Sequence, residues 1–131
     1  LKRRTGAFDF RCRDFAPQAN AGGVAQQRER ESSLLLKAVP KGAQLVVLDE
    51  RGSGWSTREL ATRLDGWRTT AQEVVFAVGG AEGHAPALRD AANALWSLSA
   101  LTLPHALVRV VVVEQIYRAW SLLNNHPYHR E

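Results

Sequence analysis

Two short, nearly uncharged stretches rich in β-branched residues most constrain how this chain folds. Residues 43–49 read Ala-Gln-Leu-Val-Val-Leu-Asp, and residues 73–78 read Glu-Val-Val-Phe-Ala-Val. Each stretch is followed by glycines and then by a helical pattern. Apolar runs of this length are typical of strands that are buried in a parallel sheet. The recurring order of strand, glycine loop and helix predicts an α/β fold, with a mainly parallel sheet flanked by helices.

Caps and apolar spacing predict the helices of this pattern. Residues 24–39 are predicted to be helical, and their charged stretch is interpreted as a solvated face because both signs of charge are mixed. Residues 56–59 (Ser-Thr-Arg-Glu) have the sequence of a capping box. Leu60, Leu64 and Trp67 then recur at i, i+4 and i+7, which predicts one buried stripe. Residues 49–54, between strand and helix, are predicted to be an acidic, glycine-rich loop.

A third helix is predicted from Pro86, which suits a first helical position because it lacks an N–H group. Its small-residue face would include Ala87, Ala91, Ala94 and Leu95.

The first fifteen residues predict a helix end and a strand. Residues 1–4 read like the end of a helix, whereas residues 8–15 alternate in polarity and predict a half-buried strand. The chain begins with Leu1 and not with Met. We therefore expect that one strand of the sheet precedes residue 1 and is absent from the sequence.

Residues 107–120 are compatible with two secondary structures. The valines at 108 and 110–113 are β-branched and favour a strand. Pro104 instead suits a helix start, after which Glu114 and Arg118 would pair at i, i+4. The residues alone leave both alternatives open.

Length and composition limit the class of protein. We assign residues 1–131 to one domain, which is long enough for a real core. Seventeen Lys and Arg against 13 Asp and Glu give a net charge of +4, which is compatible with a nucleic-acid partner without requiring one. The single cysteine, Cys12, excludes an intramolecular disulfide and fits a reducing cytoplasm.

We expect neither a membrane-spanning segment nor a metal site. Arg109 interrupts the apolar run at 108–113, and no stretch has the length of a membrane span. Of four histidines only His126 and His129 are close in sequence, and no cysteine or carboxylate pair completes a plausible metal site.

Two loops at predicted strand ends are candidate binding sites. Residues 79–83 (Gly-Gly-Ala-Glu-Gly) would let backbone amides approach a ligand, although glycines also serve ordinary turns. Leu48 and Asp49 end the strand predicted at residues 43–49, and ligands of open α/β sheets bind at such strand ends. The simpler alternative is a strand that ends in a solvated Asp.

The last residues are dense in aromatic and cationic groups. Tyr128 and His129 can stack on an extruded base, and Arg130 can bind a phosphate or a carbonyl oxygen. The alternative is that this segment packs on another subunit. Both interpretations would hold if the segment of one subunit completes the active site of another.

The chain resembles the ribosomal RNA large subunit methyltransferase H family, a member of the SPOUT class of knotted methyltransferases. The resemblance covers roughly residues 43–131 and is weak over the first forty. Its most specific stretches are 97–105 (Ser-Leu-Ser-Ala-Leu-Thr-Leu-Pro-His), 107–109 (Leu-Val-Arg), 114–115 (Glu-Gln), 117–120 (Tyr-Arg-Ala-Trp), 127–130 (Pro-Tyr-His-Arg) and the glycine loop at 78–83.

The resemblance implies a SPOUT-like fold with a deep C-terminal trefoil knot, whose knot and cofactor region spans about 76–131. It also implies that residues 107–120 are helical. The cofactor would be S-adenosyl-L-methionine. The positions that match the family's cofactor site are Leu48, Gly80, Ser99, Ala100, Leu101, Thr102, Leu103 and Pro104. For Ser99 and Thr102 the alternative is that their hydroxyls only stabilise an ordinary turn.

The implied activity is methylation of large-subunit ribosomal RNA at N3 of a pseudouridine, on the assembled ribosome and by a homodimer. Arg118, Tyr128, His129 and Arg130 are the candidate catalytic residues. The alternative function is that of a cofactor-binding or RNA-binding relative without catalytic activity.

Overall fold

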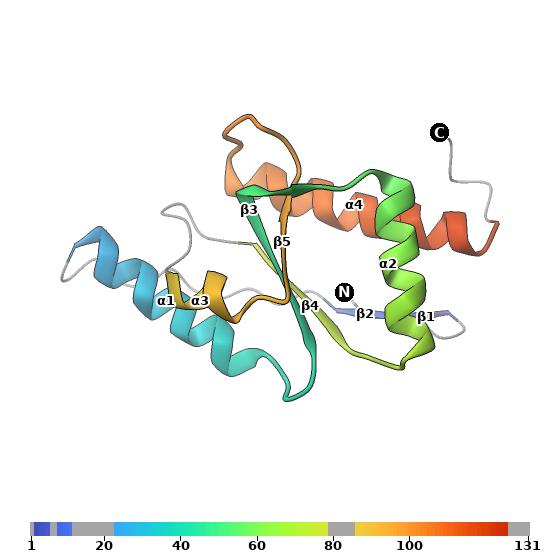
Figure 1. Ribbon diagram of the computed structural model, residues 1–131, viewed down its shortest axis with the longest axis horizontal. Helices are drawn as coiled ribbons and strands as arrows, with labels where there is room; N and C mark the ends of the chain where they lie inside the picture. The colour runs from blue at the N-terminus through green and yellow to red at the C-terminus, as the bar shows by residue number, and fades with distance from the viewer. Residues whose placement is uncertain (1, 6–7, 12–22, 79–85, 126–131) are drawn as a thin grey trace.

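The computed structural model of the chain describes residues 2–5, 8–11, 23–78 and 86–125. Strands and helices alternate from residue 44 onward, and helices lie on both sides of a sheet (Figure 1). This arrangement confirms the predicted α/β class. The elements are β1 Lys2–Thr5, β2 Phe8–Arg11, α1 Val24–Ala38, β3 Gln44–Gly54, α2 Thr57–Thr69, β4 Val74–Ala77, α3 Pro86–Ala91, β5 Ala94–Ser97 and α4 His105–Leu123.

The central strand of the parallel sheet is β3. Among the described residues this sheet has the order β4-β3-β5, with both neighbours parallel to β3. Successive side chains of a strand point to opposite faces. Leu45 and Val47 accordingly contribute to one buried cluster, and Val46 and Leu48 to another. Both faces of β3 are therefore covered.

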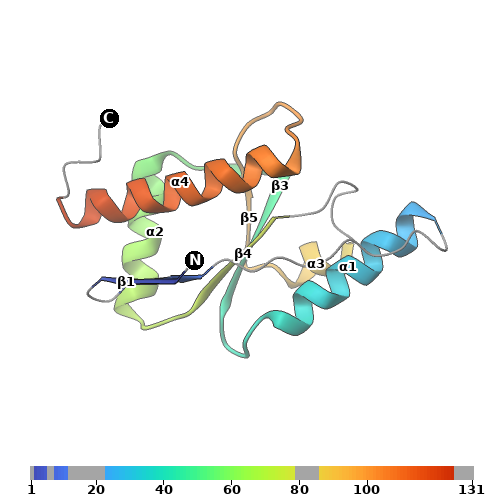
Figure 2. The ribbon, with the colours of Figure 1, turned by 180° about the vertical axis from the view of Figure 1, so that it is seen from behind.

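Helices α2 and α4 pack on one face of the sheet and α1 and α3 on the other, and Figures 1 and 2 show this arrangement from opposite sides. Burial of these apolar side chains is the main source of folding free energy. The cluster under α2 and α4 contains Val46, Leu48, Leu60, Ala61, Trp96, Val112, Ile116 and Ala119. The cluster under α1 and α3 contains Leu45, Val47, Ala77 and Leu88, with Leu35, Leu36 and Val39 packed against them.

The helix starts follow the predicted signals. Ser56 Oγ accepts a hydrogen bond from the Glu59 N–H, and the Glu59 carboxylate accepts one from the Ser56 N–H, both at 3.0 Å. This is the predicted capping box. Pro86 is the first residue of α3, and Pro104 is the N-cap of α4. Residues 107–120 are thus helical, as the resemblance implies. Although α4 is rich in valine, no described helix has the length and apolar content to cross a bilayer.

The prediction for residues 1–4 is wrong. Residues 2–5 form β1, not the end of a helix, because they pair antiparallel with β2 in a separate sheet of two described strands. The predicted strand at 8–15 is confirmed as far as Arg11, and residues 12–22 lie outside the described part of the chain.

Two further predictions are wrong where β3 meets β5. The helix from Pro86 ends at Ala91, and Ala94 and Leu95 belong to β5 because residues 94–97 pair with β3. Residues 49–54, predicted to be a loop, form the second half of β3. Pairing with a distant strand decides both assignments.

The register between β3 and β5 shifts between Leu48 and Ser53, so that both residues lie opposite Trp96. We call the intervening residues 49–52 the β3 bulge. Gly52 of the bulge packs directly against β5. A Cβ atom at Gly52 would lie 2.5 Å from the carbonyl carbon of Leu95 and 2.7 Å from the amide nitrogen of Trp96. Only glycine allows so close an approach of two backbones.

We predict that Gly52→Ala lowers the free energy of unfolding by about 1–3 kcal/mol, because the new methyl group overpacks against backbone that cannot move aside. Urea denaturation measures the loss. Gly54→Ala is the matched control, since a Cβ atom at Gly54 meets no atom within 4 Å. Equal stability of the two variants would contradict the close approach at Gly52.

Candidate functional site

The carboxyl ends of β3 and β5 meet at one edge of the sheet, because the two strands are parallel. Ligands of open α/β sheets bind outside this edge. The β3 bulge lies here, and so does the connection from β5 to α4 (Figure 1). The structure thus brings Leu48 and residues 99–104 to the same edge. Gly80, the other predicted cofactor position, lies outside the described residues.

Side-chain hydroxyls shape the first half of residues 99–104. Ser97 Oγ donates a hydrogen bond to the Ser99 carbonyl oxygen at 2.8 Å, and Ser99 Oγ accepts one from the Leu101 N–H at 3.0 Å. The Ser99 hydroxyl therefore forms a local turn, which is the simpler of its two predicted roles. A turn held in this way presents its backbone in a fixed conformation.

The rest of this segment faces solvent. Ala100, Thr102 and Pro104 are exposed, Leu103 is half-buried, and Leu101 is 70% exposed. An exposed leucine beside an ordered turn is an apolar surface to which a ligand can pack. Thr102 Oγ1 donates a hydrogen bond to Glu50 Oε2 at 3.0 Å, and so attaches the segment to the β3 bulge.

Leu48 lies mostly in the core. It is 7% exposed and pairs with Trp96, whose ring stacks on that of Trp55 at a centroid distance of 5.1 Å. Leu48 can therefore offer a ligand only a small apolar edge. Its neighbour Asp49 is also held by the protein, because its carboxylate lies 3.7 Å from the Arg89 guanidinium and accepts the Arg51 N–H at 2.9 Å.

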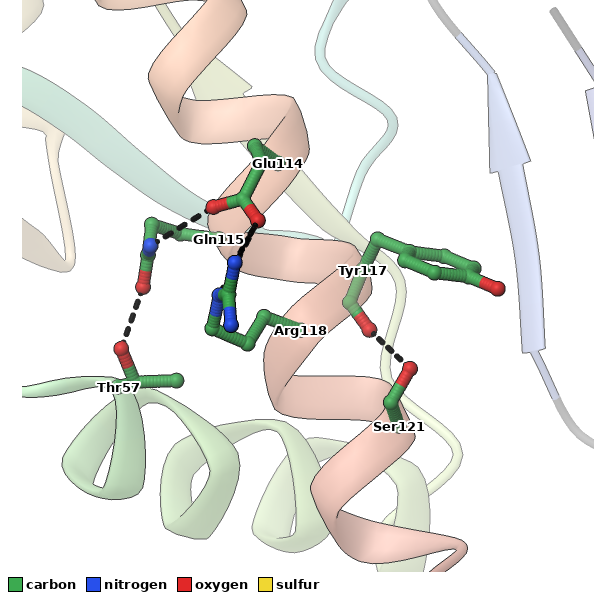
Figure 3. A network of polar contacts seen from close by, with 6 residues as sticks. All are labelled: Thr57, Glu114, Gln115, Tyr117, Arg118 and Ser121. Atoms are coloured by element: carbon green, nitrogen blue, oxygen red, sulfur yellow. Dashed lines mark hydrogen bonds and ion pairs between the residues drawn. The ribbon is translucent and has the colours of Figure 1, made fainter. Parts of the chain in front are cut away.

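The candidate catalytic residue Arg118 is held by a polar network on α4 (Figure 3). Its Nε and Nη2 atoms donate to Glu114 Oε2 at 3.1 and 2.5 Å, which confirms the predicted i, i+4 pair. The other carboxylate oxygen of Glu114 accepts a hydrogen bond from Gln115 Nε2 at 2.9 Å. The guanidinium is thereby fixed along one edge while its side chain stays 27% exposed.

A contact from α2 completes the network. Thr57 Oγ1 donates to Gln115 Oε1 at 2.5 Å, although the two residues are 58 positions apart (Figure 3). Sequence reasoning missed this contact, and also the contacts of Glu50 and Gly52, because no local pattern indicates a bond between distant segments. Gly52 and Gly54, close together after the predicted strand at 43–49, were the one available signal.

Of the four candidate catalytic residues, the described part of the chain contains only Arg118. Arg118 follows His105 by thirteen residues on α4, so at 1.5 Å per residue it lies about 20 Å along the helix from His105, the first residue after 99–104. Tyr128, His129 and Arg130 lie outside the described residues. Across the described part of the chain, no three His, Cys, Asp or Glu side chains group as metal ligands.

We predict that Thr57→Val lowers the free energy of unfolding by about 1 kcal/mol, because it leaves the half-buried Gln115 oxygen without its donor. Thr62→Val is the control, since the Thr62 hydroxyl bonds only to the Arg58 carbonyl of its own helix among the contacts described. Urea denaturation of both variants measures the difference, and equal midpoints would contradict a stabilising contact between α2 and α4.

The sequence is similar to those of known proteins. A family model described as "Predicted SPOUT methyltransferase" matches residues 1–129. Ribosomal RNA large subunit methyltransferase H from Nitrosococcus oceani is 52% identical over 115 residues, which cover 88% of this chain and 73% of that protein. The protein of the same name from Laribacter hongkongensis is 45% identical over 132 residues, covering 99% of this chain and 85% of its own length.

A third similar protein, from Hydrogenovibrio crunogenus, bears the same name and is 52% identical over 117 residues, or 89% of this chain and 75% of its own. Identity of this degree over most of both chains leaves no doubt about common descent. The chain belongs to the ribosomal RNA large subunit methyltransferase H family of SPOUT methyltransferases.

Proposed function

We propose that this protein methylates large-subunit ribosomal RNA at N3 of a pseudouridine, on the assembled ribosome, with S-adenosyl-L-methionine as the methyl donor. The observation that carries the proposal is the ordered, exposed turn at residues 99–104 on the ligand-binding edge of the sheet, in a chain of this family. Its site of action would be cytoplasmic, where ribosomes are found. The proposal includes the deep trefoil knot over about 76–131, a region that contains undescribed residues.

The described residues fit S-adenosyl-L-methionine in their chemistry. The cofactor has an adenine ring with apolar faces, and it has polar groups that backbone amides and carbonyls can bind. Ser99 to Pro104 would supply the backbone contacts, with Leu48, Leu101 and Leu103 as apolar neighbours. Gly80 would let a second stretch of backbone approach closely. When bound, the cofactor supplies an electrophilic methyl group on a sulfonium.

The reaction requires the target nitrogen to lose its proton. The N3–H of pseudouridine is only weakly acidic, so the ring nitrogen must become anionic before or during attack on the methyl carbon. Transfer would form a new N–C bond as the S–C bond breaks, and the N3 proton would pass to a base. Arg118 and Arg130 would position the RNA and stabilise negative charge on the ring. Tyr128 would stack on the extruded base, and His129 is the candidate proton acceptor.

We further propose that the active protein is a twofold homodimer packed through α4. Leu107 is 46% exposed and Val110 is 64% exposed, so the first half of α4 has an apolar side that the chain leaves uncovered. Arg118 lies about 20 Å along α4 from His105, which directly follows residues 99–104, and this separation also favours a second copy. Antiparallel packing of two α4 helices would bring Arg118 of one chain toward residues 99–104 of the other.

The activity is tested by transfer of labelled methyl from S-adenosyl-L-methionine to ribosomes that lack the modification, with the product identified as N3-methylated pseudouridine. We predict that truncation after Pro127 lowers the rate by about a hundredfold or more, because residues that position the target base are lost. Thermal stability, dimerisation and cofactor affinity should stay close to those of the full chain.

Arg130→Ala is the single-residue companion, and should reduce turnover more than cofactor binding. A truncated protein that methylates ribosomes at the parent rate would remove Tyr128, His129 and Arg130 from the active site. Cofactor binding by the full chain without any methyl transfer would instead favour the non-catalytic alternative.

The homodimer is tested by Val110→Glu, which would bury an unpaired charge in the proposed interface. We predict a dimer for the parent protein and a monomer for the variant in sedimentation at micromolar concentration. Thr62→Glu, at an exposed position on α2, should remain dimeric. A parent protein that is monomeric and fully active would contradict the proposal.

A further inference from the structure

The β3 bulge is joined to residues 99–104, which we call the candidate cofactor segment, across a long separation in the sequence. Thr102 Oγ1 donates a hydrogen bond of 3.0 Å to Glu50 Oε2, over a separation of 52 residues. The acceptor is a carboxylate, and hydrogen bonds to charged groups are stronger than those between neutral groups. This contact attaches the exposed half of residues 99–104 to the central strand of the sheet.

The bulge offers a fixed point of attachment because it is held on both sides of Glu50. On one side, Asp49 lies 3.7 Å from the Arg89 guanidinium and accepts the Arg51 N–H at 2.9 Å. On the other side, Gly52 lies so close to β5 that an added Cβ atom would be 2.5 Å from Leu95. The backbone around Glu50 is thereby tied to α3 and to β5.

The two halves of the cofactor segment are ordered by different contacts. The hydroxyls of Ser97 and Ser99 shape the turn that begins the segment. Beyond Leu101 the chain is exposed up to the start of α4, apart from the half-buried Leu103. The bond from Thr102 to Glu50 fixes this second half against the sheet.

We propose that Glu50 is a positioning residue, which holds residues 99–104 in the conformation that binds the methyl donor without touching the donor itself. The inference rests on the function proposed above. A segment that is ordered before binding loses less conformational entropy when the ligand binds, so its affinity is higher. Glu50 would act entirely through Thr102.

Cofactor affinity of the full chain, measured by calorimetry with S-adenosyl-L-methionine, tests the proposal. We expect Glu50→Ala and Thr102→Val each to weaken affinity about three- to tenfold, since each removes one side of the hydrogen bond. Glu50→Gln should restore most of the affinity, because its amide oxygen still accepts. The double variant Glu50→Ala/Thr102→Val should be no weaker than the weaker single variant.

Glu73→Ala is the matched control. It removes the same charge from an exposed position next to the start of β4, at the opposite edge of the sheet, and should leave affinity unchanged. A general effect of charge would lower or raise affinity in both glutamate variants alike. Unchanged affinity in Glu50→Ala, or fully additive losses in the double variant, would overturn the proposal.

Hydrogen exchange in the cofactor-free protein separates this inference from the proposed function. If Glu50 orders the segment, the amides of residues 100–103 should exchange faster in Glu50→Ala and in Thr102→Val, and at the parent rate in Glu73→Ala. A parent chain that fails to bind S-adenosyl-L-methionine would refute the proposed function, while the exchange rates would still decide whether Glu50 positions the segment. Equal exchange in all variants would refute the positioning role.

Discussion

The burial of β3 on both faces is the constraint on which the rest of the structure depends. Its four consecutive apolar residues, 45–48, are all buried, and complete burial of each such side chain is worth about 1.5–3 kcal/mol. Because both faces are apolar, hydrophobicity alone distinguishes poorly between neighbouring registers of β3 and β5. Polar contacts at the start of β5 favour the observed register. Asn93 Oδ1 accepts the Leu45 N–H at 2.8 Å, and the Asn93 N–H donates to the Leu45 carbonyl oxygen at 2.8 Å.

The fixed register has consequences at the other end of the strand. Pairing with β5 is interrupted after Leu48 and resumes at Ser53, and the β3 bulge projects between these residues. The bulge meets the connection from β5 to α4 through Glu50 and Thr102. The candidate cofactor site is thus made largely of backbone, ordered by hydroxyl and carboxylate side chains. Such a construction suits ligand binding, whereas Arg118, the proposed catalytic residue that the structure describes, lies farther along α4.

In a single chain, α4 leaves part of its apolar surface exposed and separates Arg118 from the candidate cofactor segment. Its inner side is buried against the sheet and α2, with Val112, Ile116 and Ala119 in the core, while Val110 stays 64% exposed. Its length also separates the cofactor segment at one end from Arg118 toward the other. A second copy of the chain would cover the exposed apolar side and shorten this separation at once. The same helix would then provide both the interface and part of the active site.

Local signals in the sequence determined much of this fold. The apolar runs at 43–49 and 73–78 and the capping box at 56–59 needed no tertiary information, because neighbouring residues produce them. The helical state of 107–120 and the cofactor positions at 99–104 came from family resemblance. Only the tertiary structure decided β5 and the β3 bulge, since pairing between distant strands creates both. The bonds from Glu50 to Thr102 and from Thr57 to Gln115 join residues 52 and 58 positions apart, and no short-range pattern encodes such contacts.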